Sequence, residues 1–258
     1  MCGFPLLHLD KHLKVLVQQH KRFVAMCEEF PRKEEFGAKE FDRRVTRIIT
    51  PGTLIDEPFL NAFENNFLLA IDVPFPSQGE INNDTPMIGL AWIDVSTGEF
   101  YTKKTPLETV QDDLVRINPR EVILSDTFEG VKEHPLMNAL VEENCFLNFI
   151  SKSMDSPTEE QTAPRPDYSE EIPLSTVEQT AVDLLTSYLN ANLLESMPPL
   201  TSPVQDNGGR MQIDAHTIKA LEIRETEYDG SSRGSLFSAI KRTITNGGTR
   251  LLSRWLCM

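Results

Sequence analysis

The feature that most constrains the fold is an alternation of strand-like and helix-like segments between residues 67 and 150. The strand-like segments are rich in branched and aromatic residues, whereas the helix-like ones place apolar residues at helical spacing. Strands are expected at 67–73, 87–95, a segment ending near Thr102, 121–124 and 145–150. Helices are expected after Pro106 and around 135–141. Such an alternation predicts a mixed sheet that is covered by helices.

The expected helix after Pro106 has both start and stop signals. Thr105 and Glu108 have the spacing of a capping box, and Pro106 would occupy the first helical position. Asn118 and Pro119 end the helix, because a residue that precedes a proline disfavours helical backbone angles. We therefore expect one complete helix at this point of the chain.

A helix, two strands and a turn are expected ahead of this region. The apolar residues of the helix recur with a helical period and are Leu6, Leu9, Leu13, Leu16 and Val17. A short buried strand is expected at 23–27, and a more exposed one, which contains three arginines, at 43–50. The turn that closes the second strand contains Pro51 and Gly52.

The segment 151–173 is polar, acidic and rich in proline, which predicts a linker that cannot pack a core. A helix with a long apolar stripe is expected to begin at Thr176. Two short helices are expected later, one capped by Ser235 and one beginning near Thr245. No polar cap follows the apolar face of the last helix, so we expect that helix to continue past residue 258.

The net charge of -14 is unevenly distributed along the chain. Residues 1–50 carry +3, residues 51–209 carry -20 and residues 210–258 carry +3. The basic ends allow contacts with phosphates, whereas the acidic middle would avoid DNA or face a protein partner. Four scattered cysteines do not predict a disulfide or zinc framework. No run of eighteen apolar residues occurs, so no membrane contact is expected.

Several ordered strings of residues resemble one family. The C-terminal string comprises Asp214, Ala215, Thr217, Leu221–Ile223, Gly234–Leu236, Thr245, Gly248, Arg250, Leu252, Trp255 and Leu256. It resembles the beginning of the core (lever) domain of MutS-family DNA mismatch-repair proteins. The N-terminal string, from Gly3 to Thr53, is similar to the second half of the MutS mismatch-binding domain. The phrases at 64–71 and 88–100 look most like the mitochondrial branch of fungal MutS proteins.

The resemblance implies a multi-domain α/β fold in four parts. Residues 1–53 would be the C-terminal half of the mismatch-binding α/β domain, and 66–150 a connector domain with ribonuclease-H-like topology. Residues 151–173 would be an acidic linker, and 174–258 the truncated beginning of the all-α core (lever) domain. The chain would then be a fragment of a mismatch-repair protein.

The resemblance also implies a function, which is a part in ATP-dependent recognition of DNA mismatches. The sequence has no GxxxxGK[ST] phosphate loop, so this chain is expected to be neither an ATPase nor another enzyme. No cofactor is expected in this chain, whereas ATP and Mg²⁺ would be bound by the intact protein. Its expected partners are double-stranded DNA, possibly mismatched, a MutL-type protein through the connector, and a second copy in a dimer. A mitochondrial location is expected, with a nuclear one as the alternative.

The residues that the resemblance assigns to DNA are few. The family reads a mismatch with a Phe-x-Glu motif, and this sequence contains none. Gly3, Phe4 and Pro5 match a loop near the DNA, and Arg47 matches a strand position facing the DNA backbone. Because phosphate contacts position a protein without reading bases, we expect weak, non-specific binding.

Two other classes of function remain open. A ribonuclease-H-like nuclease would bind metal ions with strand-end carboxylates, and Asp72, Asp94 and Asp126 lie at or near strand ends. However, strand-end aspartates are common in turns, and Asp94 is most simply a hairpin corner. The other class is a short adaptor, without catalytic activity, that binds a partner through its acidic middle.

Overall fold

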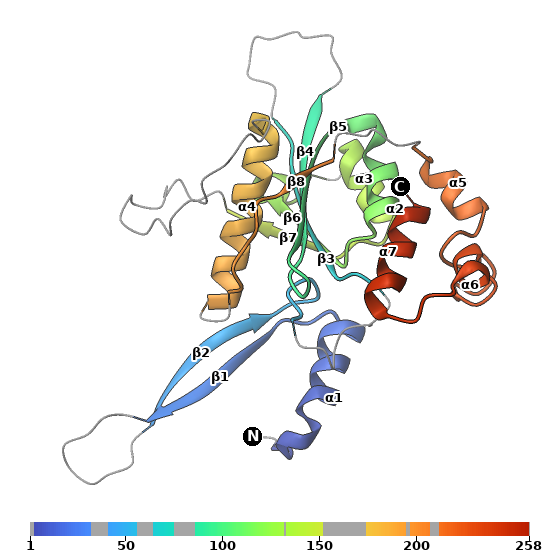
Figure 1. The fold of residues 1–258 in the computed structure, drawn as a ribbon. Helices are drawn as coiled ribbons and strands as arrows, with labels where there is room; N and C mark the ends of the chain where they lie inside the picture. Colours follow the sequence, from blue (N-terminus) through green and yellow to red (C-terminus); the bar gives the residue numbers. More distant parts are fainter. Residues whose placement is uncertain are drawn as a thin grey trace, which may run out of the picture.

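The computed structural model describes residues 3–31, 41–55, 64–74, 86–131, 133–151, 174–194, 197–206 and 212–257. Its centre is a six-stranded sheet in the order β7-β6-β3-β4-β5-β8 (Figure 1). A separate two-stranded ribbon projects from one end of this body. The elements after residue 212 lie against one side of it.

The order of the strands follows from three antiparallel strands and two parallel returns. β3 (Phe67–Asp72), β4 (Met87–Asp94) and β5 (Glu99–Pro106) pair antiparallel in sequence order. β6 (Glu121–Ser125) then pairs parallel to β3, and β7 (Leu147–Ile150) parallel to β6. This connectivity is that of the ribonuclease-H-like topology, so the predicted α/β fold class is confirmed.

Alternate residues of each strand point to opposite sides of the sheet, and helices cover both sides. On one face, residues such as Leu69 and Ile71 pack against α2 (Val110–Ile117) and α3 (Pro135–Glu142). On the other face, the cluster that includes Leu68 packs against α4 (Thr176–Leu193). Figure 1 shows α4 on the side of the sheet opposite α2 and α3.

The position of α4 corrects the expected division of the chain. The expectation placed residues 174–258 together in the core domain, whereas α4 covers the sheet of the connector. Ala181, Leu185 and Leu189 of α4 are fully buried in the same cluster as strand residues of β3 and β4. The apolar stripe of α4 predicts that one face of the helix is buried. That face packs against the second face of the sheet, which would otherwise be exposed. The linker segment 152–173 lies outside the described residues.

The helix starts are partly as expected. Ser175 and Glu178 form a complete capping box at α4, and Ser235 and Thr245 cap α6 (Leu236–Ile240) and α7 (Asn246–Leu256). The predicted capping box of Thr105 and Glu108 is wrong. Pro106 is the last residue of β5 and leads into a 3-10 turn, and the Thr105 hydroxyl instead bonds that of Thr109 at 3.0 Å.

The N-terminal helix consists of a 3-10 turn (Leu6–His8), α1 (Leu9–Leu13) and a π-helical stretch (Lys14–Gln19). Only part of its expected apolar stripe is buried. Leu13 and Val17 pack against Ile49 and Leu54, whereas Leu6 and Leu16 are exposed.

β1 (Val24–Pro31) and β2 (Phe41–Ile49) form the antiparallel ribbon. The expectation of a buried strand at 23–27 is wrong, because the ribbon extends away from the body and the helix covers only its base.

The C-terminal part forms a small cluster on α2. Ile218 of α5 (Ala215–Ala220), Ile223 and Cys257 are buried together, with Val115 of α2 packed against them. β8 (Val204–Gln205) leads toward this part and pairs parallel to β5. None of the helices in the described ranges combines the length and the hydropathy that a membrane span requires.

Candidate nucleic-acid interface

The N-terminal loop predicted to lie near DNA is accessible. Phe4 is 48% exposed, and its ring centre lies 4.5 Å from that of His12. Gly3 has no atom within 4 Å of the position that a Cβ would take. The Pro5 carbonyl accepts a hydrogen bond from His8 N at 2.9 Å, which starts the helix. The N-terminus lies at the end of this helix that is remote from the six-stranded sheet (Figure 1).

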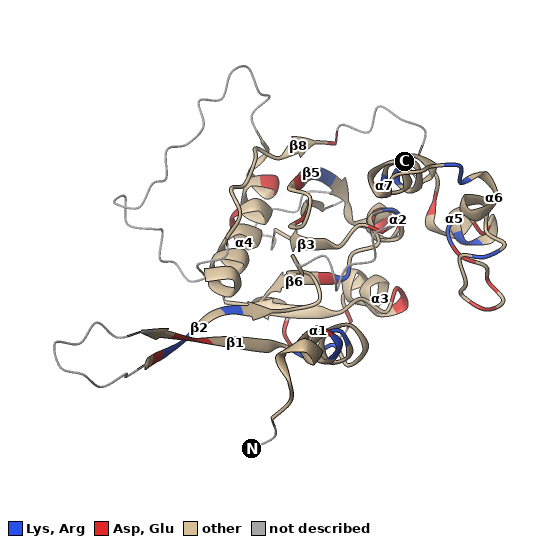
Figure 2. Ribbon diagram, turned by 60° about the horizontal axis from the view of Figure 1, so that its bottom comes forward, with Lys and Arg blue, Asp and Glu red and all other residues tan. Residues whose placement is uncertain are grey.

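The second predicted contact, Arg47, lies on β2. It is half-buried and stands opposite Met26 of β1. Two other arginines lie farther along the ribbon, and both have partners within it. Arg43 pairs with Glu29 at 2.7 Å, and the Arg44 guanidinium lies 3.9 Å from the centre of the Phe30 ring. Figure 2 shows basic residues on both the helix and the ribbon.

The loop and Arg47 are separate sites. Val17, near the far end of the helix, packs against Ile49, which lies two residues after Arg47. The helix of about 14 residues places the loop roughly 20 Å from that contact. Duplex DNA presents a phosphate about every 3.4 Å along each strand, so one duplex can reach both sites only at phosphates several positions apart.

A buried carboxylate fastens the base of the ribbon to the sheet. Glu121, the first residue of β6, has 0% exposure. Its Oε2 accepts hydrogen bonds from Thr50 Oγ1 at 2.6 Å and from Gly52 N at 2.8 Å. Its Oε1 accepts from the Tyr188 hydroxyl of α4 and from Asn148 Nδ2 of β7 at 3.5 Å. One side chain therefore joins the turn after β2, two strands and a helix.

Burial raises the pKa of the Glu121 carboxyl, although hydrogen bonds from Thr50, Tyr188, Gly52 and Asn148 each lower it. A folded-state pKa above the unfolded value means that the folded protein binds this proton more tightly. The contribution of this group to stability is then complete below the unfolded pKa and is lost as pH rises through the raised pKa.

We therefore expect the wild type to lose unfolding free energy relative to Glu121→Gln as pH rises above the ordinary carboxyl pKa of about 4.3 and through the raised pKa of Glu121. Urea unfolding of both proteins across this range tests the expectation. A difference between the two proteins that is independent of pH would contradict it.

The three carboxylates of the nuclease alternative do not meet. Asp94 is a hairpin corner, because its oxygens accept from Asn66 N and Ser96 N, each at 3.0 Å. In the antiparallel register Asp94 faces Phe67, so it lies five residues, or about 17 Å, from the end of β3 that holds Asp72. Asp126 follows the parallel strand β6 and lies at the Asp72 end. In the described part of the chain, no cluster of three acidic, His or Cys side chains has metal-binding geometry.

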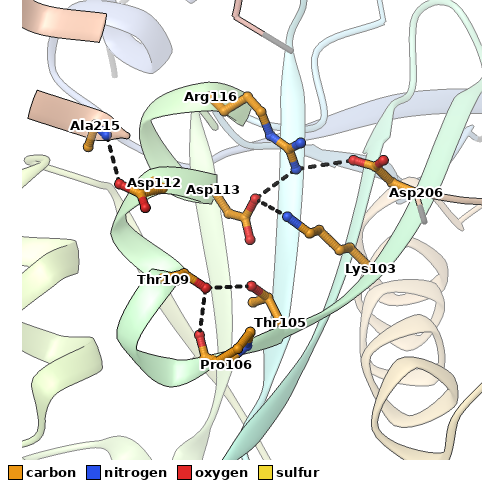
Figure 3. A network of polar contacts seen from close by, with 9 residues as sticks. All are labelled: Lys103, Thr105, Pro106, Thr109, Asp112, Asp113, Arg116, Asp206 and Ala215. Atoms are coloured by element: carbon orange, nitrogen blue, oxygen red, sulfur yellow. Dashed lines mark hydrogen bonds and ion pairs between the residues drawn. The ribbon is translucent and has the colours of Figure 1, made fainter. Parts of the chain in front are cut away.

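A second polar network joins α2 to the chain beyond β8 (Figure 3). Asp113 of α2 is 3% exposed, and its Oδ1 accepts from Lys103 Nζ of β5 at 2.6 Å and from Arg116 Nη2 at 2.7 Å. Arg116 also pairs with Asp206 at 3.1 Å. The charges in this network therefore hold a strand, a helix and the segment after β8 together.

The C-terminal part uses the same helix. Asp112 Oδ1 accepts a hydrogen bond from Ala215 N at 2.7 Å, at the start of α5 (Figure 3). Arg224 donates to the carbonyl oxygens of Val115 at 2.9 Å and of Arg116 at 2.6 Å. These carbonyls lie in the last turn of α2 and would otherwise lack partners. Sequence reasoning missed this junction, because its members are about a hundred residues apart.

Three family models match the chain in order. The model described as MutS domain I matches residues 1–58, MutS domain II matches 66–201 and MutS domain III matches 216–258. The match to domain II includes α4, in agreement with the packing of α4 on the sheet.

Similar curated proteins carry the name DNA mismatch repair protein MutS. The protein from Nitrobacter winogradskyi is 34% identical over 99% of this chain, that from Rhodopseudomonas palustris (strain HaA2) 37% over 99%, and that from Bartonella henselae 34% over 98%. The chain spans 28–29% of the length of these relatives. All three are bacterial and do not support the narrower prediction of a fungal mitochondrial branch.

Proposed function

Because this chain belongs to the MutS family of DNA mismatch-repair proteins, we propose that it contributes a DNA-backbone contact held rigidly to a connector domain. The proposal rests on the position of the exposed N-terminal loop and of the arginines of β2, which both belong to the basic segment 1–50. The turn at the base of the ribbon is bonded into the core of the sheet. A backbone contact of this kind supplies affinity and orientation.

The proposed contact does not distinguish mismatched from matched DNA. Base discrimination needs groups that reach base edges or insert between bases. The sequence contains no Phe-x-Glu motif, and among Gly3, Phe4, Pro5 and Arg47 only Arg47 has a charged side chain that can pair with a phosphate. Binding should therefore depend on salt rather than on base pairing.

We further propose that a longer protein, of which this chain forms a part, performs the ATP- and Mg²⁺-dependent steps of mismatch repair. Dimerisation and the contact of the connector with a MutL-type partner would belong to that protein. Its mitochondrial location, with a nuclear one as the alternative, stays a prediction.

The DNA contact is tested by fluorescence anisotropy with one matched and one mismatched duplex across a salt series. We expect a Kd of about 10⁻⁴ to 10⁻⁶ M for both duplexes, with affinity falling as salt rises. Arg47→Ala should weaken binding to both duplexes equally and reduce the salt slope by about one.

Arg43→Ala is the matched control, because it removes an arginine of the same strand to which the family resemblance assigns no DNA contact. It should change binding less than Arg47→Ala does. Absence of binding by the wild type, or a mismatched duplex bound more than about tenfold tighter than its matched partner, would overturn the proposal.

A further inference from the structure

We propose that Glu121 is a positioning residue for the DNA contact, because it fixes the orientation of the ribbon relative to the sheet. This inference rests on the proposed function, since it concerns how the contact is presented. Glu121 itself is fully buried beneath the turn at residues 50–53 and cannot touch DNA.

The turn at residues 50–53 is closely packed against the sheet. Thr50 and Thr53 are buried, although a connecting turn is ordinarily on the surface. A Cβ at Gly52 would lie 2.6 Å from Leu68 Cδ1 and 3.0 Å from Glu121 Oε2. The turn is therefore closely packed, and its hydrogen bonds to Glu121 fix its orientation relative to the sheet.

Hydrogen bonds reach the carboxylate from two sides, from the turn and from α4 with β7. Thr50 N donates to Thr53 Oγ1 at 2.9 Å, and the two threonine hydroxyls bond each other at 2.9 Å. Thr50 Oγ1 then donates to Glu121. On the other side, Asn148 Nδ2 donates to the Tyr188 hydroxyl at 2.9 Å, and Tyr188 donates to Glu121. Glu121 thus orders hydroxyls on both the ribbon side and the α4 side.

A neutral amide cannot replace this carboxylate. Each of the two carboxylate oxygens accepts hydrogen bonds from two donors, whereas a glutamine side chain has one oxygen and one NH₂ group. If the NH₂ group took the place of Oε2, it would face the Gly52 N–H, and if it took the place of Oε1, it would face Asn148 Nδ2; neither group can act as an acceptor. The unsatisfied donors would release the turn, and the ribbon would lose its fixed orientation while Arg47 stayed intact.

The turn contributes no residue to the two large clusters that form the core of the sheet. These clusters contain residues of β3, β4, β6 and the three covering helices. Loss of the Glu121 bonds should therefore loosen the junction locally. This separates a positioning role from general stabilisation.

Site-resolved hydrogen exchange of the whole chain tests the inference, with Glu121→Gln compared with Glu64→Gln. Glu64 is the matched control, because it is a glutamate that forms an ion pair at the surface with Arg120, the residue directly before Glu121. We expect the Gly52 amide to exchange about tenfold faster in Glu121→Gln, since its hydrogen bond to Glu121 Oε2 is lost. Amides of β3 and β4 should keep their wild-type rates, and the affinity for matched duplex should fall severalfold.

Several results would overturn the inference. Wild-type exchange at Gly52 in Glu121→Gln would show that the carboxylate does not hold the turn. Faster exchange throughout β3 and β4 would show general stabilisation instead of positioning. Faster exchange at Gly52 with unchanged DNA affinity would show that orientation does not matter for the contact.

Tyr188→Phe provides a smaller change, because it removes one donor to Oε1 and keeps the ring in place. It should also accelerate exchange at Gly52, and a wild-type rate there would count against the inference. A wild-type chain that binds no DNA would instead defeat the proposed function, and exchange measured without DNA would still decide whether Glu121 fixes the turn.

Discussion

Replacing Gly89 by alanine is expected to displace α4 from the sheet and to lower the free energy of unfolding by about 3 kcal/mol or more. A Cβ at Gly89 would lie 2.0 Å from the carbonyl oxygen of Val177 and 2.9 Å from Glu178 N. These are backbone atoms in the first turn of α4, so no side chain can rotate to relieve the clash. The helix must move, and its buried leucines must leave their cluster on the sheet.

Urea denaturation followed by circular dichroism measures this effect. Gly247→Ala is the matched control, because no atom lies within 4 Å of the corresponding Cβ and Gly247 is in a helix. The control should be neutral or slightly stabilising, since alanine favours a helix more than glycine does. If Gly89→Ala unfolded at the wild-type urea concentration, the close contact between β4 and α4 would be refuted.

The second large effect is expected for Asp113→Ala. The change leaves the Lys103 ammonium, whose residue is 7% exposed, without its 2.6 Å partner, and it removes one of the two partners of Arg116. Breaking a buried ion pair from one side costs about 3–5 kcal/mol, because the remaining charge stays desolvated. The loss should also loosen the segment after β8, which Arg116 holds through Asp206.

A double variant sharpens this prediction. Asp113→Ala combined with Lys103→Met removes the stranded charge, so it should recover part of the lost stability. Glu29→Ala is the control for an exposed pair, since both Arg43 and Glu29 are at least half exposed, and its effect should be small. Thermal unfolding measures all three variants. Equal effects of Asp113→Ala and Glu29→Ala would contradict the buried network.

The sheet was predictable from the sequence because its strands are buried on both faces. Leu68 and Leu69 are neighbours that point to opposite sides, and both are fully buried, so the strand appears in the sequence as a continuous apolar run. The stripe of α4 is equally clear, but periodicity shows only that a face is buried and not what covers it. The packing of α4 on the sheet therefore differs from the predicted domain boundary, and Pro106, predicted to start a helix, is the last residue of β5.

The polar junctions were much harder to predict. Lys103 and Asp113 lie on different elements, and Glu121 bonds a turn about seventy residues earlier in the chain. The sequence offers one signal for the Glu121 junction, because Glu121 is an acidic residue at the start of an otherwise largely apolar strand. Arg47 and the loop Gly3–Pro5 were assigned through the family resemblance alone, and their contact with DNA stays a prediction.

The most direct test of the proposed DNA interface is a map of amide chemical shifts in the ¹⁵N-labelled chain as a short matched duplex is added at low salt. We predict that the shifts concentrate at Gly3 and Phe4 and on β2 around Arg47, and that they disappear when salt is raised. Shifts centred instead on the C-terminal ends of β3 and β6, near Asp72 and Asp126, with the loop and β2 unchanged, would contradict the proposed interface.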